Sequence, residues 1–487
     1  MKDLREWMAA VEAEGDLKRI TAEVNWELEL GHIATLNERQ QGPALLFENV
    51  KDYKVPVLAS TCSTAKRMAI TCGRPSHYSL CEVAKDWKAI HEQGKHVDPV
   101  VVPGVPSIYE VVEGDAINLW EIPVPRMYPQ DGGRYFGLAT CFVTEDPETG
   151  WTNLGTYRAQ VLDETTLGCN IWIGTKHGKH HIDKYLKTGK TKMPIAIYCG
   201  CDIFHFVAGS ARVPEQQDEY GVIGAMMGQP VEVFKGDLTG LKLPAHAEYV
   251  LEGELDLDQA NWRPEGPLGE YVGYYGASGA GTPKPPMAVK RMYRRRDPIF
   301  VITTVGRPIG DTHIINTITL TAALWADLET MKVPGIKSVY VPPEAAGRFW
   351  AIVSAKIAYP AHAQRILEAV ACSPTGHFGI KGVIVVDDDI AADDMAGVWW
   401  SLACRYNPVP DTQMLNKMRP TPFDPALPIG QKTFGSTILI DATIPVEWEK
   451  KPIPVVLDEA TTRLVVDKWR QYGFDKPYPT LGGTLPR

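Results

Sequence analysis

Hydrophobic positions near the start of the chain recur at helical spacing. Leu4, Trp7, Met8 and Val11 fall on one face of a helix, and a strand-like run at residues 17–24 follows. The chain is therefore expected to open with an α/β segment. Short buried strands are expected at residues 44–47 and 55–59, and a second helix at residues 83–91.

A Pro/Gly-rich passage at residues 122–134 interrupts this periodicity and indicates a domain or subdomain boundary. Beyond it, residues 138–144 and 152–162 are strand-like runs separated by a turn signal, which predicts a hairpin. Further strands are expected at residues 195–198, 231–234, 248–252, 287–293 and 300–304, and helices only at residues 178–187 and 218–227. Many strands with few helices between residues 135 and 305 predict a barrel-like or split-sheet domain.

After residue 308, helical and strand patterns alternate again, as is typical of a compact α/β domain. Helices are expected at residues 317–331, 361–371 and 395–404, strands at residues 338–341 and 382–386, and a final helix at residues 458–472.

Composition narrows the class of protein. The chain has 487 residues, of which 44% are hydrophobic and 22% charged, and this predicts a globular protein of two or three domains. A formal net charge of −9 argues against a nucleic-acid partner, because proteins that bind nucleic acids usually carry an excess of basic residues. The 9 cysteines include no CxxC pair, which favours a reducing cytoplasm. No apolar stretch approaches the roughly 18 residues needed to span a bilayer, and no secretory segment is expected.

The most informative motif lies at residues 263–275. Glu265 and Glu270 are five positions apart, and the glycines and proline between them forbid a regular helix. A looped backbone brings two such carboxylates to one site, where their proximity in a low-dielectric pocket raises one pKa. One of them is then able to donate a proton near neutral pH. The alternative is a solvent-exposed turn with two ordinary acids.

A second motif runs from Asn153 to Arg158. Asn153 offers a hard amide oxygen that suits magnesium or manganese, and Arg158 offers a planar fork for a carboxylate or phosphate. Strict strand alternation would place these two side chains on opposite faces, so a shared site requires a bulge or bend, for which Gly155 is the candidate.

A third motif places three imidazoles and two ammonium groups at the expected start of a helix. They are suited to a metal or a phosphate, although a solvated basic turn is the alternative. The residues are Lys176, His177, Lys179, His180 and His181.

A fourth motif, with Asp218, Glu219 and Tyr220, opens another expected helix, where acids usually complement the helix dipole. Taken in order and spacing, the four motifs resemble those of UbiD-like decarboxylases, and the resemblance spans nearly the whole chain. The glutamate motif at residues 265–270, followed by Gly273, Tyr274 and Tyr275, is its most specific part.

The resemblance implies a reaction and a fold. The family uses prenylated FMN for reversible, non-oxidative decarboxylation, through a covalent bond between cofactor and substrate. The expected substrate is an aromatic, heteroaromatic or α,β-unsaturated carboxylic acid. The implied fold is a mixed α+β and α/β multidomain protein. Its expected parts are a prenylated-FMN-binding domain at residues 1–310 (an α/β segment at 1–120 and a flavin-reductase-like split barrel at 135–305), an α/β oligomerisation domain at 315–445, and a C-terminal tail with a helix at 446–487.

The resemblance also implies roles for individual residues. Asn153, His177 and Glu219 are the expected ligands of a divalent cation, with manganese the first candidate. Potassium is a further expected ion. His180 and His181 remain alternatives to His177. The expected cofactor-lining residues are Thr156, Tyr157 and Arg158, with Lys176 and Lys179 neutralising the phosphate.

Arg158, Glu265 and Glu270 are the expected catalytic network, with Glu270 as the proton donor. Expected partners are the small carboxylic acid, a flavin prenyltransferase that supplies the cofactor, and copies of the same chain in a homodimer or homohexamer. Three alternatives remain at this point: a carboxylase or carboxylase subunit of anaerobic aromatic metabolism, a catalytically inactive family-like subunit, and a metal-dependent hydrolase without a flavin.

Overall fold

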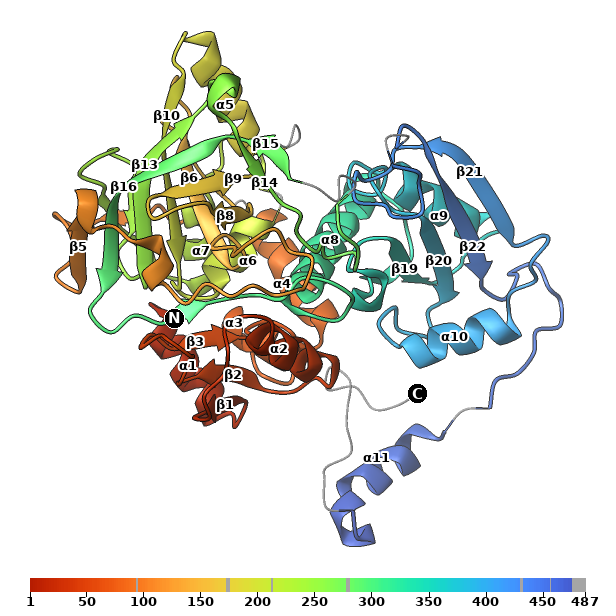
Figure 1. The fold of residues 1–487 in the computed structure, drawn as a ribbon. Helices are drawn as coiled ribbons and strands as arrows, with labels where there is room; N and C mark the ends of the chain where they lie inside the picture. Colours follow the sequence, from red (N-terminus) through yellow and green to blue (C-terminus); the bar gives the residue numbers. More distant parts are fainter. Residues whose placement is uncertain are drawn as a thin grey trace. The chain divides into compact units, whose positions relative to one another are not determined.

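A computed structural model describes residues 1–92, 95–171, 176–211, 213–276, 281–429, 432–455 and 457–474 (Figure 1). The chain divides into two compact units. The first unit contains Met1–Gly73 and Ile90–Asn316, and the second contains Arg74–Ala89 and the chain from Thr317 onward. The Pro/Gly-rich passage at residues 122–134 therefore lies inside the first unit.

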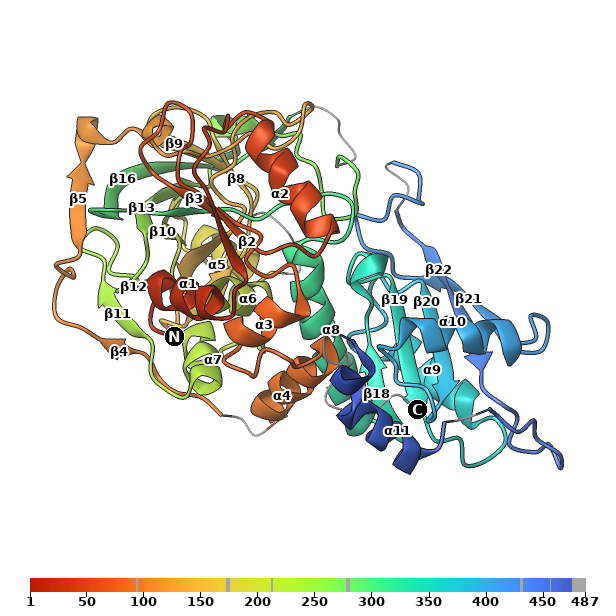
Figure 2. The same ribbon diagram turned by 90° about the horizontal axis from the view of Figure 1, so that it is seen from below.

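The first unit contains a small mixed sheet in the strand order β1-β2-β3-β17. Strands β1 to β3 lie beside helices α1 and α2 in the N-terminal segment of the chain, at the red end of the colour scale in Figures 1 and 2. Helix α1 forms as the sequence pattern predicts. The side chain of Asp3 caps it by accepting hydrogen bonds from the backbone N–H groups of Arg5 and Glu6, and its apolar face is buried. The elements are α1 (Leu4–Ala13), β1 (Leu17–Ile20), α2 (Glu29–Arg39), β2 (Ala44–Phe47), β3 (Val57–Ala59), α3 (Ala65–Thr71) and β17 (Phe300–Val301).

The centre of the first unit is an antiparallel sheet in the order β7-β6-β10-β13-β16-β9-β8, with β5 also paired to β16. Its two outer strands, β7 and β8, are joined by residues 156–158 alone. Seven strands in a flat sheet would separate the outer two by about 29 Å, whereas the connection from Gly155 to Ala159 reaches about 15 Å at most. The sheet must therefore curl, and it forms a half-barrel (Figure 1).

The other elements of the first unit surround this sheet. Its strands are β5 (Tyr109–Glu113), β6 (Thr140–Glu145), β7 (Thr152–Gly155), β8 (Ala159–Val161), β9 (Thr166–Cys169), β10 (Lys192–Cys199), β13 (Tyr249–Asp256) and β16 (Pro286–Arg295). The flanking elements are β4 (Val100–Val101), α5 (His177–Lys187), α6 (Phe204–Ser210), α7 (Glu219–Met227), β11 (Glu232–Lys235), β12 (Lys242–Pro244), β14 (Arg263–Glu265) and β15 (Thr282–Lys284).

The second unit is an α/β domain built on a mixed sheet in the order β18-β19-β20-β22-β21. Helix α9 packs across β19, β20 and β22 (Figure 2), and the core between them is aliphatic. Helix α8 begins in the first unit and continues into the second. The elements are α4 (Leu80–Glu92), α8 (Asp311–Thr330), β18 (Ile336–Tyr340), β19 (Trp350–Ala355), α9 (His362–Cys372), β20 (Gly382–Asp387), α10 (Met395–Cys404), β21 (Thr412–Met418), β22 (Gly435–Ala442) and α11 (Glu459–Asp467).

Several sequence-based expectations need correction. Residues 152–162 form two strands, β7 and β8, rather than one, because the chain turns at residues 156–158 to close the curl. Helix α6 was not expected, because nearly all its residues are buried and leave no amphipathic period. Helix α2 was missed because its buried face includes Gly31, Thr35 and Glu38.

Among the helices in the described parts of the chain, none is long and apolar enough to cross a membrane. All nine cysteines lie within these parts, and none of them forms a disulfide.

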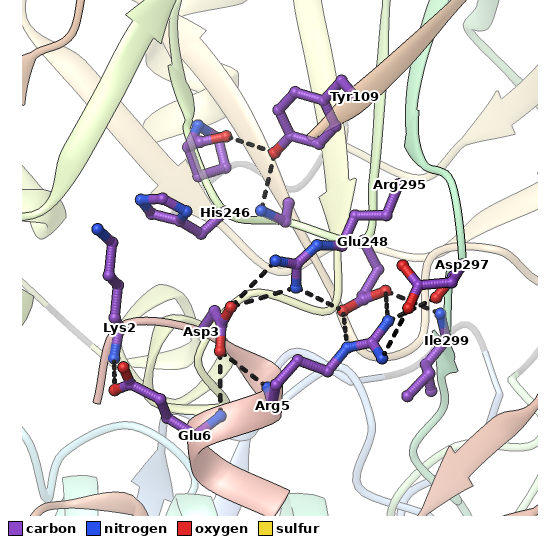
Figure 3. Close-up of polar contacts among 12 residues, drawn as sticks. Lys2, Asp3, Arg5, Glu6, Tyr109, His246, Glu248, Arg295, Asp297 and Ile299 are labelled. Atoms are coloured by element: carbon purple, nitrogen blue, oxygen red, sulfur yellow. Dashed lines mark hydrogen bonds and ion pairs between the residues drawn. The ribbon is translucent and has the colours of Figure 1, made fainter. Parts of the chain in front are cut away.

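A buried ion-pair network fixes the N-terminal helix to the large sheet (Figure 3). The carboxylate of Glu248 is fully buried and accepts hydrogen bonds from Arg5 Nε and Nη2, both at 3.1 Å. It also accepts from Arg295 Nη1 at 3.2 Å and from the backbone N–H of Ile299 at 2.8 Å. Arg295 in turn contacts Asp3, the cap of α1. One carboxylate therefore joins α1 to the end of β16.

Replacing Glu248 with alanine is expected to lower the free energy of unfolding by about 3 kcal/mol, because two guanidinium groups lose their buried partner. Replacing Glu459 with glutamine is the control, since its ion pair with Arg463 is exposed and is worth about 0.5 kcal/mol. Urea denaturation measures both changes. Equal effects of the two substitutions would show that the Glu248 network does not hold α1 in place.

Candidate active site

The connection between β7 and β8 carries part of the candidate site. Residues 156–158 leave the sheet there, and the backbone N–H of Thr156 donates a hydrogen bond to the carbonyl of Gly209 on α6 at 3.2 Å. Asn153 lies before the break on β7 and is buried. Arg158 lies at its end. The strict alternation that would separate these two side chains is therefore interrupted where the sequence analysis requires a bend.

The loop after β14 carries the two glutamates. Glu265 is the last residue of β14, and the next residue, Gly266, has a φ of 97°, a left-handed conformation that favours glycine. The side chain of Glu265 is fully buried, and that of Glu270 is 14% exposed. The alternative of a solvent-exposed acidic turn does not describe this loop.

Arg158 lies between the two carboxylates. Its Nη2 donates a hydrogen bond to Glu265 Oε2 at 3.0 Å, and its Nε lies 2.8 Å from Glu265 Oε1 in an ion pair. Its Nη1 donates to Glu270 Oε1. The structure thus brings together the three side chains that the sequence analysis groups, and Glu265 makes two of the three contacts to the guanidinium.

The electrostatics of the site distinguish the two acids from the arginine. Burial raises the pKa of Glu270, the nearby Glu265 carboxylate raises it further, and Arg158 opposes both effects without cancelling them. Burial acts to lower the pKa of Arg158, but the two carboxylates outweigh it and raise the pKa. Arg158 therefore remains a cation, whereas Glu270 holds a proton to higher pH than an ordinary glutamic acid.

Residues outside the four sequence motifs anchor the glutamate loop. The side chain of Gln160 accepts a hydrogen bond from the backbone N–H of Gly266 at 2.8 Å, and its Nε2 donates to the carbonyl of Gly132 at 3.0 Å. The N–H of Gly132 donates to the carbonyl of Pro267 at 2.7 Å. Sequence reasoning missed these contacts, although the consecutive glycines at residues 132 and 133 are a signal of close backbone approach.

Asn153 and Glu219 form a second polar group. Glu219 is the first residue of α7 and is 2% exposed, and its Oε2 accepts a hydrogen bond from the backbone N–H of Leu154 at 2.8 Å. Burial raises the pKa of Glu219 to about 8. Among the described residues, Glu219 has no ion-pair partner. A buried carboxylate in this situation is stabilised by a bound cation.

The three histidines of α5 differ in their surroundings. His177 and His181 each place a ring centroid 4.9 Å from that of Trp151, and His180 lies 6.0 Å from His177. His181 is fully buried, and its Nδ1 lies 2.9 Å from Thr144 Oγ1, which also accepts from the Asn153 amide. Burial lowers the pKa of His181 to about 4. Burial and the neighbouring His180 lower the pKa of His177.

The two lysines at the start of α5, Lys176 at the N-cap and Lys179 in the first turn, contact different partners. Lys176 places its Nζ 5.9 Å from the ring centroid of Tyr157, whose hydroxyl accepts a hydrogen bond from the N–H of Gly178 at 3.2 Å. Lys179 pairs with Asp183 one turn further along. Within the described part of the chain, no group of three His, Cys, Asp or Glu side chains is arranged to hold a metal. The candidate set relies on the amide oxygen of Asn153.

Comparison with known proteins places this chain in one class, the carboxy-lyases. Three domain models of 3-octaprenyl-4-hydroxybenzoate carboxy-lyase match the chain: the N-terminal domain at residues 8–87, the Rift-related domain at residues 101–308 and the C-terminal domain at residues 313–442. The chain belongs to the UbiD family, and it is a decarboxylase of that family.

Solved structures agree with this assignment. The UbiD-class enzyme HmfF from Pelotomaculum thermopropionicum, in complex with FMN, is 27% identical with a TM-score of 0.85, covering 96% of this chain and 100% of that chain. An evolved dimeric form of HmfF, in complex with prFMN, is 28% identical with a TM-score of 0.78. The match covers 95% of this chain and 100% of that chain. Vanillic acid decarboxylase from Sedimentibacter hydroxybenzoicus, in open form, is 28% identical with a TM-score of 0.84. The match covers 97% of this chain and 98% of that chain.

Replacing Gly132 with alanine is expected to displace the glutamate loop, because the added Cβ would overlap the carbonyl oxygen of Gly266. A misplacement of about 1 Å at a reacting group costs up to about 10²-fold in rate. Steady-state decarboxylation kinetics measure this loss. Gly435 to alanine is the control, because its Cβ would meet no atom closer than 3.5 Å. Unchanged kinetics in the Gly132 variant would contradict the anchoring of the loop by this contact.

Proposed function

We propose that this protein is a prenylated-FMN-dependent decarboxylase of an aromatic, heteroaromatic or α,β-unsaturated carboxylic acid, with Glu270 as its proton donor. The observation that carries the proposal is the single guanidinium of Arg158 shared by the carboxylates of Glu265 and Glu270. One positive charge faces two buried acids, which favours a proton on one of them, and the raised pKa of Glu270 supports Glu270 as the acid that carries it.

Each residue of the network has a distinct task in this mechanism. Prenylated FMN, when bound, supplies the electron sink that the loss of carbon dioxide requires. Arg158 orients the substrate carboxylate by charge-assisted hydrogen bonds and tethers Glu265. Glu270 then gives its proton to the carbon that has lost carbon dioxide, which is general-acid catalysis by a carboxyl group with a raised pKa.

The cofactor phosphate and a divalent cation are proposed to be held by Asn153, His177 and Glu219. The buried Glu219 carboxylate without an ion-pair partner among the described residues supports a cation there. An amide oxygen, a carboxylate and an imidazole form a donor set that suits manganese. Potassium is proposed as a further ion. Thr156, Tyr157 and Arg158 are proposed to line the cofactor, with Lys176 and Lys179 near its phosphate. The curled sheet is proposed to be a flavin-reductase-like split barrel.

Further parts of the proposal concern partners. A flavin prenyltransferase is proposed to supply the cofactor. The second unit is proposed to be the oligomerisation domain of a homodimer or homohexamer, with the tail that contains α11 reaching a neighbouring subunit. Exposed aromatic side chains support this, because large exposed apolar groups mark interaction surfaces. Those of α10 are Trp399 at 68% and Trp400 at 46% exposure.

The substrate is best identified by a screen. Purified protein, produced together with a flavin prenyltransferase, is incubated with a panel of aromatic and α,β-unsaturated acids, and carbon dioxide release is measured. Vanillic acid belongs to the panel, because a structural neighbour is named for it. Mass action decides between decarboxylation and carboxylation, so hydrogen exchange at the product carbon is measured alongside. Colourless but active protein would contradict the need for a flavin.

Replacing Glu270 with glutamine is expected to abolish turnover while leaving the flavin absorbance of the protein unchanged, because the amide cannot donate the required proton. Carbon dioxide release and the flavin spectrum measure the two properties separately. Replacing Glu254, whose carboxylate pairs with Lys290 at the surface, with glutamine is the control and should keep full activity. A near-native rate in the Glu270 variant with the flavin bound would refute the proton-donor role.

Replacing His177 with alanine is expected to lower both the manganese content and the flavin content of the purified protein, because a cation ligand is lost. Elemental analysis and flavin absorbance measure these contents. The same substitution at His180 is the matched control and should leave both contents unchanged. If the His181 variant loses metal and the His177 variant does not, the ligand is His181.

A further inference from the structure

The backbone on both sides of Glu270 is held by side chains from distant segments. The N–H of Gly269 donates a hydrogen bond to Asp131 Oδ1 at 3.1 Å. The carbonyl of Tyr271 lies 2.6 Å from His313 Nε2. The residues on either side of the candidate proton donor are therefore each bonded, through one backbone group, to a buried side chain, since Asp131 is 3% and His313 is 1% exposed.

Asp131 holds the first of these groups to a neighbouring loop. Its Oδ2 accepts a hydrogen bond from the backbone N–H of Tyr128 at 2.9 Å, while Oδ1 accepts from Gly269. Tyr128 packs against Gly269, and a Cβ on that glycine would lie 3.2 Å from the tyrosine ring. One carboxylate thus joins the backbone of residues 128–131 to the backbone immediately before Glu270.

His313 holds the second group to the start of α8. Its Nδ1 accepts a hydrogen bond from the N–H of Gly310 at 2.9 Å, so the ring proton belongs to Nε2, which donates to the Tyr271 carbonyl. Burial lowers the pKa of His313, so the neutral ring that this bridge needs is the form present at neutral pH.

The start of α8 is itself fixed. Asp311, buried in the same turn, accepts hydrogen bonds from the backbone N–H groups of Thr61 at 3.1 Å and Cys62 at 2.9 Å. The turn that carries His313 is therefore hydrogen-bonded to residues 61 and 62. The loop that His313 contacts contains glycines at positions 266, 269 and 273. Within the loop, the N–H of Glu270 donates to the carbonyl of Tyr274 and the N–H of Gly273 donates to the carbonyl of Glu270, both at 2.9 Å. Glu270 therefore lies in a local turn, and Asp131 and His313 tie this turn to the rest of the unit.

We propose that Asp131 and His313 are positioning residues for Glu270, which they hold against Arg158 by fixing the N–H of the residue before it and the carbonyl of the residue after it. This inference rests on the proposed role of Glu270 as the proton donor. Neither side chain takes part in proton transfer itself. Their contribution is geometric, because a displacement of about 1 Å at a reacting group costs up to about 10²-fold in rate.

Two substitutions of His313 separate the hydrogen bond to Tyr271 from the size of the side chain. In His313→Gln, the amide nitrogen takes the place of Nε2 and still donates to the carbonyl. In His313→Asn, the shorter amide takes the place of Nδ1, keeps an acceptor for Gly310 and loses the donor to Tyr271. The asparagine variant is expected to lose up to about 10²-fold in kcat with KM and flavin content unchanged. The glutamine variant should retain most of the wild-type kcat.

His362 offers a matched control in the second unit. It is fully buried, its Nδ1 accepts from the N–H of Ala358 at 3.2 Å, and its Nε2 lies 3.1 Å from the carbonyl of Pro334. His362→Asn therefore removes the same kind of backbone bridge, and it should lower the melting temperature without changing kcat. The acid that the wild-type protein turns over fastest in the substrate panel serves as the probe for all variants.

Asp131→Asn gives an independent test, because an amide cannot accept hydrogen bonds from both Tyr128 and Gly269 through two oxygens. It should also lower kcat at unchanged KM. Hydrogen exchange of the 265–275 peptide, measured by mass spectrometry on the flavin-loaded protein, should be faster in both Asp131→Asn and His313→Asn than in wild type or His362→Asn. This measurement does not require a substrate.

Two results would overturn the inference. One is a wild-type kcat in His313→Asn and Asp131→Asn, and the other is an equal loss in His313→Gln and His313→Asn. If Glu270→Gln is inactive while these anchor variants are fully active, the inference alone fails. If Glu270→Gln is itself active with the flavin bound, the proposed function fails, whatever the anchor variants show.

Discussion

The site depends on one guanidinium placed between two carboxylates. Arg158 contacts Glu265 through two nitrogens and Glu270 through one, and all three side chains are largely buried. A single positive charge cannot compensate two negative charges in a low-dielectric site, so one acid keeps its proton more tightly. The less strongly bound carboxyl, that of Glu270, is the one whose pKa is raised. This imbalance of charge therefore favours retention of the proton by Glu270 to higher pH than in an ordinary glutamic acid.

The fold provides the geometry that this pairing needs. The curled sheet brings its outer strands β7 and β8 close enough to be joined by residues 156–158, and that connection delivers Arg158 to the site. The glutamate loop contains a local turn at Glu270, and side chains from other segments tie it in place: Gln160, Asp131 and His313. Their contacts help to explain why Glu265 and Glu270 are largely buried, although the loop also contains the exposed residues Gly273 and Tyr274.

Local patterns in the sequence predict much of this structure. The buried face of α1, the β6–β7 hairpin and the span of α10 follow from periodicity, and the two glutamates follow from their spacing in a loop that cannot be helical. The break between β7 and β8 does not, because it results from closure of the whole sheet. Asp131 and His313 are also not predicted from the sequence, since each bonds to a segment more than 40 residues away. A hydrogen bond to a backbone group also places no requirement on the residue type of the partner.

The claim that Glu270 retains a proton is tested most directly by infrared titration of the flavin-loaded protein, as a difference between wild type and Glu270→Gln. The account predicts that wild type contains a carboxyl group that stays protonated to higher pH than an ordinary glutamic acid, and that the glutamine variant lacks it. Identical titrations of the two proteins, with every carboxyl ionising in the ordinary range, would contradict the account.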